Sequence, residues 1–331
     1  MVRFLIARLS VTFSLTLVLA GLVVLPPAPV QAQAYPNRPI KMIVPHAPGG
    51  VTDVVTRIMV QPLSEALGQS VVVENRPGAA GLVGTEVAAK APADGYTLLQ
   101  FVDTNTIFPS VQKQIGHDPA GSFAPITLLV RGSHVLIANP AVPANNLQEL
   151  IAYAKSKPGE VAFASPGVGS PQHLAAEILQ TSTGIKLIHV PFKGGGQAIG
   201  DVVGGHVPLG LLGMAPTLPF VRDGKLKVIA VTGANRSPLL PNIPTVAESC
   251  VPGFQTIQWQ GVVAPAGTPE AIIARLHAET VKVMNSPTVV ERLKGVGMEV
   301  ATNTPAEFRA MIADELKRWP GVVQKAGIEP E

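Results

Sequence analysis

Short apolar runs alternate with longer amphipathic segments along the chain from residue 40 onwards. The run Ile40–Val44 ends at Pro45 and predicts a strand buried on both faces. A helix is expected at Val51–Leu67, because its apolar residues gather on one side and Gly68 follows it. Pro62 is expected to start or kink the last part of that helix. Further strands are expected at residues 71–73, 96–102, 135–138, 161–164, 187–190, 209–212, 227–232 and 257–264, and further helices at 78–90, 146–157, 170–181, 197–203, 269–285, 288–294 and 305–319.

This alternation of strand and helix implies an α/β fold class with parallel sheets. The pattern occurs twice, with a crossing near residues 129–135 and a return near residues 254–263. We therefore expect two lobes, each a mixed or parallel sheet flanked by helices. Residues 35–131 together with 254–331 would form the first lobe, and residues 132–253 the second. Two connecting strands can act as a hinge, and the cleft between the lobes is expected to hold a ligand.

The first 34 residues have the pattern of an export signal. Arg3 and Arg8 precede the apolar stretch Leu9–Leu25, and the small residues that follow allow cleavage after Ala32 or after Ala34. The alternative is an uncleaved membrane anchor, since the stretch approaches spanning length. We expect cleavage and export. No stable membrane insertion is expected afterwards, because the rest of the chain has no stretch of about 18 uninterrupted apolar residues.

Charge and cysteine content narrow the possible partners. The 25 Lys and Arg residues exceed the 22 Asp and Glu residues by three. Without Arg3 and Arg8 the balance is 23 against 22, and no basic stripe with aromatic residues is present, so we expect no nucleic acid partner. Cys250 is the only cysteine, which excludes an internal disulfide. A lone thiol of this kind is more often a buried small hydrophobe than a nucleophile, but the sequence leaves the exposure of Cys250 open.

The segment 45–53 joins a strand end to a helix start through a Gly-Gly turn. The start of a helix offers unpaired N–H groups and the positive end of the helix dipole, which together suit an anion. Asp53 could cap the helix or bind a cationic part of a ligand. The alternative is an ordinary Gly-Gly helix entry with a capping Asp. The candidate ligand-binding residues here are His46, Ala47, Pro48, Gly49, Gly50, Thr52 and Asp53.

Three further strand ends carry polar or Gly-rich turns, at residues 103–106, 165–173 and 191–196. Open α/β sheets bind ligands at the carboxyl ends of their strands. Each turn alone is compatible with ordinary turn chemistry, but four together predict a polar cleft. His173 could instead cap its helix or pack in the lobe, and Lys193 could be solvated. The candidates in these turns are Asp103, Thr104, Asn105, Ser165, Gly169, Ser170, His173 and Lys193.

Patterns for catalysis and metal binding are weak. Ser170 follows Gly167-Val168-Gly169 but lacks the G-x-S-x-G arrangement of a nucleophile elbow. His173 and Glu177 are four residues apart, yet they form no H-E-x-x-H motif. No phosphate-binding P-loop is present. We therefore expect no catalytic residues, no metal and no cofactor.

Several collinear segments of the mature chain carry a family resemblance. They are residues 35–40, 45–53, 72–79, 94–99, 163–165 with Ser170 and His173, 189–194, 237–248 and 265–269. In this order they resemble the periplasmic substrate-binding proteins of tripartite tricarboxylate transporters, the Bug family. The resemblance implies a two-lobed periplasmic binding protein of type II. Such a receptor traps a small organic carboxylate in the periplasm and delivers it to the membrane subunits of its transporter.

The resemblance also implies how the ligand is held. The turn at residues 45–53 and the loop Ala164–Ser170 would bind the near carboxylate through backbone N–H groups, hydroxyls and ordered water. Asp53 matches an acidic position that can face an ammonium group in amino-acid-binding relatives. His46 stands where Phe is common and could offer an additional donor.

The chain departs from the family pattern after residues 208–211. Family members usually carry an aromatic residue and an Asp there, whereas this chain has Leu212-Gly213-Met214-Ala215. The departure implies a more apolar far wall, with Phe101, Phe108 and Met214 as possible liners. A hydrophobic or aromatic carboxylate is therefore favoured over citrate.

Two other functions remain compatible with the sequence. A sensory accessory would use the same ligand site but engage a signalling protein instead of a transporter. A secreted hydrolase on a similar scaffold would need a nucleophile and base, for which Ser170 and His173 are the candidates.

Overall fold

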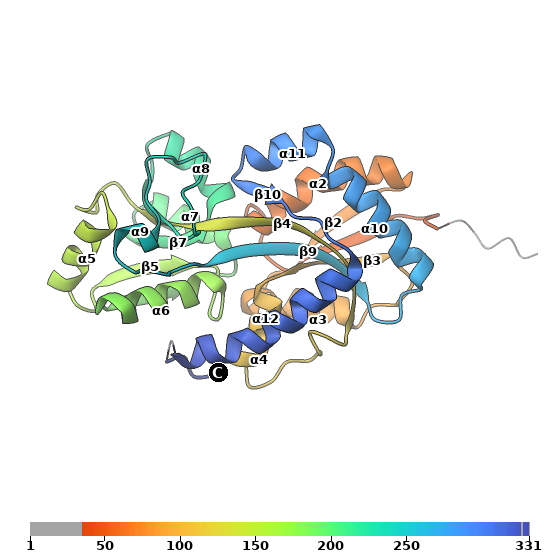
Figure 1. Cartoon of the computed structure of the whole chain (residues 1–331), viewed down its shortest axis with the longest axis horizontal. Helices are drawn as coiled ribbons and strands as arrows, with labels where there is room; N and C mark the ends of the chain where they lie inside the picture. Colours follow the sequence, from red (N-terminus) through yellow and green to blue (C-terminus); the bar gives the residue numbers. More distant parts are fainter. Residues whose placement is uncertain (1–34, 326, 331) are drawn as a thin grey trace, which may run out of the picture. The chain divides into compact units, whose positions relative to one another are not determined.

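The structure is a computed structural model that describes residues 35–325 and 327–330. The expected export signal and both cleavage positions lie outside the described residues. From Arg38 onwards the chain forms one compact unit (Figure 1). None of the described helices is both long and apolar enough to span a bilayer.

The first lobe contains a mixed sheet. Its strand β1 (Ile40–Val44) is parallel to both of its neighbours, β2 (Val71–Asn75) and β3 (Thr97–Val102). Two antiparallel strands follow β3, namely β9 (Ile257–Pro265) and then β4 (Phe123–Ala138). All but one of the β1 residues are buried, as expected for a strand covered by helices on both faces.

Strand β4 passes from the first sheet into a second one. Up to Ser133 it pairs with β9, and it also pairs with β10 (Met298–Val300). From His134 onwards it pairs with β7 (Leu209–Gly213), and its last residues also pair with β8 (Lys227–Val231). The two lobes are therefore connected by the long strand β4 and by the chain leading into β9.

The second sheet is completed by β5 (Val161–Ser165) and β6 (Leu187–Pro191). These strands are parallel to each other, and β5 is parallel to β7. Both sheets are therefore mixed and flanked by helices, so the predicted fold class is confirmed. The lobe boundaries at residues 131/132 and 253/254 stay a prediction, which the change of partners along β4 supports.

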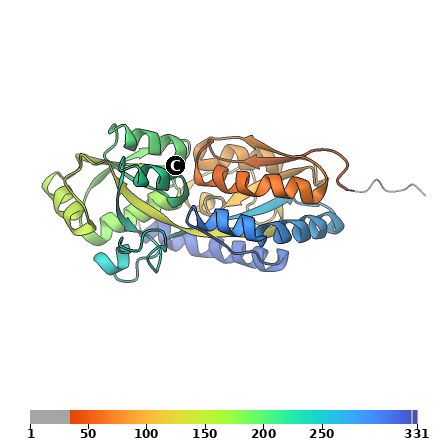
Figure 2. The ribbon, with the colours of Figure 1, turned by 90° about the horizontal axis from the view of Figure 1, so that it is seen from above.

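Helices cover the sheets, as Figures 1 and 2 show. Helix α2 runs unbroken through Pro62 and ends at Gly68, whose φ of 68° is the left-handed conformation that glycine adopts readily. The helices of the first lobe are α2 (Val51–Leu67), the short η1 (Ala79–Gly81), α3 (Leu82–Ala89), α4 (Thr104–Val111), α10 (Glu270–Met284), α11 (Pro287–Lys294) and α12 (Pro305–Lys325), and those of the second lobe are α5 (Leu147–Ser156), α6 (Pro171–Thr183), α7 (Gly195–Val203), α8 (Met214–Arg222) and α9 (Val246–Ser249).

An aromatic cluster forms the core of the first lobe. Phe101 stacks on Trp259 with ring centroids 6.2 Å apart and meets Phe123 edge-on at 5.6 Å. Phe308 from α12 also packs edge-on against Phe101. Because Phe101 is fully buried in this cluster and Phe108 is 2% exposed beside His117, the expectation that these two side chains line the ligand site is wrong.

The C-terminal helix α12 connects the lobes on one side. Its residues Trp319 and Val323 share a buried cluster with Ile107 of α4 and with Leu174 of α6. This contact joins the helix that starts after β3 to the helix that starts after β5. It lies close to the strand ends from which the candidate site is built.

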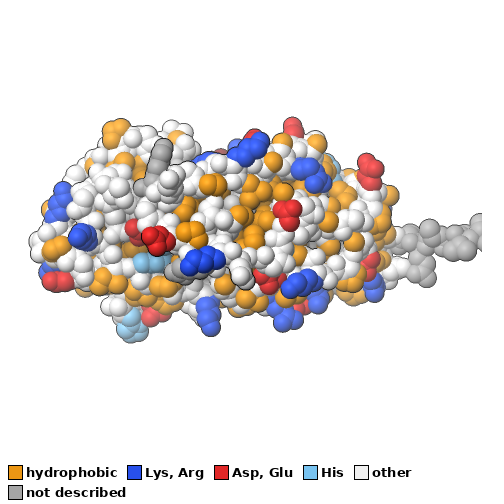
Figure 3. Space-filling model, turned by 90° about the horizontal axis from the view of Figure 1, so that it is seen from below, with side chains coloured by type: hydrophobic (Ala, Val, Ile, Leu, Met, Phe, Trp, Pro, Cys, Tyr) orange, Lys and Arg blue, Asp and Glu red, His pale blue; other side chains and the backbone are white. Residues whose placement is uncertain are grey.

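Some expected features differ from the structure. Residues 104–111 form helix α4, and residues 214–222 form α8 despite Pro216 and Pro219, whereas the sequence pattern predicts a helix in neither segment. The sequence left the exposure of Cys250 open, and the structure places Cys250 at the surface. Basic and acidic side chains are interspersed on the face seen in Figure 3, in keeping with the nearly balanced charge.

Candidate functional site

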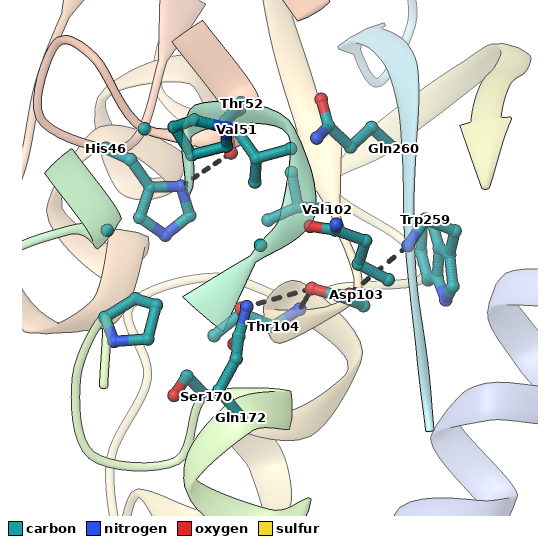
Figure 4. A pocket seen from close by; sticks show the side chains of 16 residues that line it. His46, Val51, Thr52, Val102, Asp103, Thr104, Ser170, Gln172, Trp259 and Gln260 are labelled. Carbon is teal, nitrogen blue, oxygen red and sulfur yellow. Dashed lines mark hydrogen bonds between the residues drawn. The ribbon is translucent and has the colours of Figure 1, made fainter. Parts of the chain in front are cut away.

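Five helices begin at one cavity between the two lobes (Figure 4). Each follows a strand: α2 follows β1, α4 follows β3, α6 follows β5, α7 follows β6 and α8 follows β7. The N–H groups of a first helical turn have no partner within the helix, and the helix dipole adds a partial positive charge there. The lining residues at these helix starts are Gly50, Val51, Thr52, Asp103, Thr104, Ser170, Gln172, Gly195, Gly213 and Pro216.

The cavity is closed around a small volume. It measures about 30 Å³, which is room for roughly two water molecules. The start of helix α7 in the second lobe comes close to the turn after β1 in the first: a Cβ added to Gly196 would lie 2.7 Å from the carbonyl oxygen of Pro48. A Cβ on Gly213 would likewise lie 3.0 Å from Cβ of Val51. The structure therefore represents the closed arrangement of the lobes.

His46 at the end of β1 is fixed by two hydrogen bonds. Its Nε2 lies 3.0 Å from the carbonyl oxygen of Ala80, so Nε2 must carry the proton and donate it. Its Nδ1 then accepts from the Thr52 hydroxyl at 3.2 Å. Burial lowers the pKa of His46 to about 4, so the ring is neutral at neutral pH. Because its only N–H is already used, the expectation that His46 offers an additional donor to the ligand is wrong.

Asp53 stabilises the Gly-Gly turn by hydrogen bonds. Its Oδ2 accepts hydrogen bonds from the Gly49 backbone at 3.0 Å and from Arg57 at 2.9 Å, and its Oδ1 accepts from Asn75 at 3.0 Å. Burial by itself would raise the pKa of Asp53, but these hydrogen bonds outweigh it and lower the pKa. The carboxylate is satisfied within the first lobe and does not line the cavity, which favours the structural alternative for this residue.

Asp103 caps helix α4 and faces the cavity. Its carboxylate accepts from the Thr104 backbone at 2.8 Å and from the Trp259 backbone at 3.3 Å. The side chain is only 6% exposed, and burial raises the pKa of Asp103 to about 7. Near neutral pH this carboxyl can therefore carry a proton, which no ordinary surface Asp does.

The second-lobe loop is held by backbone contacts. Ser170 caps helix α6: its hydroxyl accepts from the His173 backbone at 3.2 Å and donates to the Gly167 carbonyl at 2.8 Å. The ring of His173 accepts at Nδ1 from the Gly169 backbone at 3.2 Å. Both side chains thus shape the loop that borders the cavity.

Three rings stack behind this loop. His173 lies on His189 with centroids 4.0 Å apart, and His189 lies on Phe163 at 4.9 Å. The buried Ser165 hydroxyl contacts Nε2 of His189 at 2.6 Å. Burial lowers the pKa of His173 to about 4 and, together with the nearby His173, lowers that of His189 to about 3. The stack consists of neutral rings at neutral pH.

Comparison with known proteins identifies the family of the chain. The family model for the tripartite tricarboxylate transporter family receptor matches residues 55–328, most of the chain. The chain belongs to this family.

Similar receptors share both sequence and fold. Protein BugT of Bordetella pertussis is 40% identical over 306 residues, which cover 91% of this chain and 93% of that protein. The solved structure of R. palustris Rpa4515 with adipate is 33% identical, with a TM-score of 0.87 over 90% of this chain and 100% of that one. MatC from Rhodopseudomonas palustris, solved with bound malate, is 31% identical, with a TM-score of 0.80 over 87% of this chain and 100% of that one.

The receptor brings some of the predicted site residues together. The ones that line the cavity are His46, Gly50, Thr52, Asp103, Thr104 and Ser170. The ones that do not line it are Ala47, Pro48, Gly49, Asp53, Asn105, Ala164, Ser165, Gly169, His173, Lys193 and Met214.

Most residues of the second group support the receptor's loops. Asn105 accepts from the Val102 backbone at 2.7 Å and donates to Thr85 at 2.6 Å, so it fixes the start of α4. Ala164 is fully buried in the second-lobe core. Lys193 is exposed, which favours its solvated alternative.

Three glutamines give the wall of the receptor's cavity polar groups, namely Gln172, Gln258 and Gln260. Apolar lining residues such as Val102 and Pro216 stand beside them. Met214 is 1% exposed and lines a different cavity. The lining residues outside the predicted turns, which the sequence analysis missed, are Val102, Gly213, Pro216, Gln258, Trp259 and Gln260. Val51, Pro166, Gln172 and Gly195 also line the cavity and lie within the predicted turns, although they were not named as candidates.

A signal for part of this wall was present in the sequence. Gln258 and Gln260 are two residues apart on β9, so they point to the same face of the strand. Trp259 between them turns its indole ring away from the cavity into the aromatic core, as Figure 4 and the ring contacts show. Among the described residues, no group of three or more His, Cys, Asp and Glu side chains is arranged to hold a metal ion.

Proposed function

We propose that this receptor works in the periplasm, after cleavage following Ala32 or Ala34, and encloses a small carboxylate that carries a second polar group. It then delivers this ligand to the membrane subunits of a tripartite tricarboxylate transporter. The family membership supports the transport role. The residues of the cavity described above are proposed as the ligand site.

The observation that carries the proposal is the convergence of five helix N-termini on a cavity without a basic side chain. Among the described residues that line it there is no Lys and no Arg. The negative charge of a ligand must then be met by backbone N–H groups and helix dipoles, which stabilise a carboxylate without a counter-ion. The neutral His46 beside them adds no charge.

The glutamines of the cavity support a second polar group on the ligand. The side-chain amides of Gln172 and Gln260 can donate to a carboxylate, carbonyl or hydroxyl, whereas the amide nitrogen of Gln258 already donates to the Ser133 carbonyl at 3.3 Å. The relatives solved with adipate and with malate carry ligands of this kind. We therefore favour dicarboxylic and hydroxycarboxylic acids over a purely hydrophobic acid.

Ligand entry requires the lobes to separate. A cavity of about 30 Å³ holds no dicarboxylate, and the two lobes approach each other closely at Gly196 and Pro48. The lobes are joined through β4 and β9, and bending there would open the cleft. Closure around the ligand then follows from the contacts that both lobes make with it.

The arrangement at Ser170 supports a receptor over a hydrolase. The Ser170 hydroxyl contacts the His173 backbone rather than its ring, so no base is placed to activate it. The Ser165 hydroxyl does meet the ring of His189, but Ser165 is fully buried. We propose that the chain binds its ligand without chemical change.

A thermal unfolding panel followed by calorimetry tests the proposal. Adipate, malate, succinate, citrate and benzoate are added to the purified protein, and the transition temperature is measured. A ligand at 100 times its dissociation constant should add about 2.7 kcal/mol to the free energy of unfolding. No shift with any of these acids would contradict the proposal, as would conversion of the recovered ligand into a product.

A further inference from the structure

A second cavity, of about 640 Å³, lies at the hinge between the lobes. One wall comes from residues 294–299 of the first lobe, and the other from the loop 233–239 of the second. Residues 131–133 of β4 and Ile257 of β9 border it as well. Sites for small molecules typically measure about 300–1,000 Å³, so this volume suits one small organic molecule.

This cavity is distinct from the candidate ligand site, although the two are neighbours. Gln258 lines the first cavity, and its amide nitrogen lies 3.8 Å from the sulfur of Met298, which lines the second. Likewise Gly213 lines the first cavity and Met214 the second. These residues form the partition between the two cavities.

Hinge bending must change the shape of the second cavity. Strand β4 leaves the first sheet between Ser133 and His134, directly at the cavity border. Rotation of the lobes about this point changes the distance between the loop 233–239 and residues 294–299. A molecule that touches both walls therefore binds one arrangement of the lobes more tightly than the other.

The floor of the second cavity is apolar. Leu239 and Ile257 are half-buried and present apolar surface to it. Met214 and Met298, which are 1% and 0% exposed, pack beneath them. This floor suits an apolar ligand body.

The rim of the second cavity is basic. Arg131, Arg236 and Lys294 line it against a single acidic residue, Glu299. Arg236 and Lys294 each pair with a carboxylate outside the cavity, at 2.9 Å and 3.4 Å. Arg131 is exposed and lies opposite Glu299 in the strand register, yet it makes no ion pair with any described residue. Its guanidinium is therefore available to a ligand anion.

We propose that this second cavity binds an organic anion with an apolar body, whose negative group contacts Arg131 and whose body lies on Leu239 and Ile257. Such an anion bridges both lobes in their closed arrangement. It stabilises that arrangement and, by linkage, tightens binding at the first cavity. This coupling rests on the proposed function, whereas binding of the anion itself does not.

Anilinonaphthalene sulfonate, an anion whose fluorescence rises in apolar surroundings, is a suitable probe. It is titrated into the purified full-length mature protein and into variants at three positions. Arg131→Gln should weaken binding about tenfold, since it removes a charge-assisted contact, and Arg131→Lys should restore part of the affinity. Ala234→Trp should place a large side chain at the cavity border and weaken binding. Arg292→Gln on α11, an exposed residue away from the cavity, is the matched control and should bind like the original protein.

Equal binding of the probe by Arg131→Gln and the original protein would overturn the proposal, as would simple competition between the probe and the acid found for the first cavity. Because Ala234→Trp could disturb folding, its transition temperature is measured as well. The Arg131→Gln and Arg131→Lys variants, at an exposed residue, decide whether the anion binds at Arg131. Saturation with the probe should tighten binding of the acid by about fivefold in the original protein and not in Arg131→Gln. If no acid binds at all, the proposed function fails while the probe titration still tests the second cavity.

Discussion

The side-chain amide of Gln100 donates a hydrogen bond to that of Gln260, with 3.0 Å between nitrogen and oxygen. Both side chains are buried, and Nε2 of Gln260 has no partner among the described residues. Figure 4 shows the Gln260 amide pointing to the side of the cavity where Thr52 lies. A buried donor without a partner is costly unless a ligand or water accepts from it, so we expect this amide to contact the ligand.

Replacing Gln260 should therefore change specificity. Gln260→Met keeps the volume but removes the donor, and affinity for a dicarboxylate should fall about tenfold through loss of a hydrogen bond to a charged group. A monocarboxylate of the same chain length should lose less than about twofold. Calorimetric titration of both acids measures the difference, with the exposed Gln61→Met on α2 as control. If both acids lost the same affinity, Gln260 would not contact the second carboxylate of the ligand.

Closure of the lobes can be tested at Gly196. A Cβ there would come within 2.7 Å of the Pro48 carbonyl oxygen, so Gly196→Ala should prevent full closure. We expect ligand affinity to fall at least about tenfold, whereas the transition temperature without ligand stays the same because the open lobes have no clash. Gly200→Ala on the same helix is the matched control, since a Cβ there meets nothing within 4 Å. Unchanged affinity in Gly196→Ala would show that the ligand binds without this contact.

The sequence predicted the strand-to-helix junctions better than the side chains that line the cavity. Apolar runs and glycine stops located β1 and α2 with the bounds that the structure has, because these signals are local. Helix α8 was missed, since its two prolines resemble a turn. The cavity also needs long-range information: Gln258 and Gln260 become lining residues only because β9 returns to the first sheet. Conversely, Asp53 and His173 are residue types that often contact ligands. Here their side chains accept hydrogen bonds from the backbone of their own loops, from Gly49 and Gly169.

Binding should depend on pH through Asp103. Its pKa is raised to about 7, so it is largely protonated below that pH and negatively charged above it. A charged Asp103 repels the ligand carboxylate, and the dissociation constant should rise by up to about tenfold per pH unit above about 7. Asp103→Asn keeps an acceptor for the Thr104 backbone and should bind with little pH dependence between about 6 and 9. Tighter binding of the original protein at high pH would contradict this and indicate that the ionised Asp103 accepts a hydrogen bond from the ligand.

Asp103 also affects the free energy of unfolding, and this effect can be measured without ligand. A carboxyl whose folded pKa lies above its unfolded value favours folding at low pH, so its contribution is lost as pH rises from about 4 to about 7. Without ligand, Asp103→Asn should therefore gain stability relative to the original protein over this range. Chemical denaturation at about pH 5 and about pH 8 gives, at each pH, the difference in the free energy of unfolding between Asp103→Asn and the original protein.

Acid should destabilise the receptor through the stacked histidines. The pKa values of His173 and His189 are lowered to about 4 and about 3, below the ordinary value of 6.5, so the folded protein prefers the neutral rings. Their contribution is complete above about pH 6.5 and is lost as pH falls towards the folded pKa values, by at most about 1.4 kcal/mol per pH unit for each ring. His189→Phe keeps a ring on Phe163 and removes one titrating group, so its free energy of unfolding should fall less steeply between about pH 6.5 and 4.5. The exposed His206→Phe is the control and should follow the original protein. If the free energy of unfolding fell equally steeply with pH in His189→Phe and in the original protein, protonation of His189 would not destabilise the folded state. The stack would then be open to solvent.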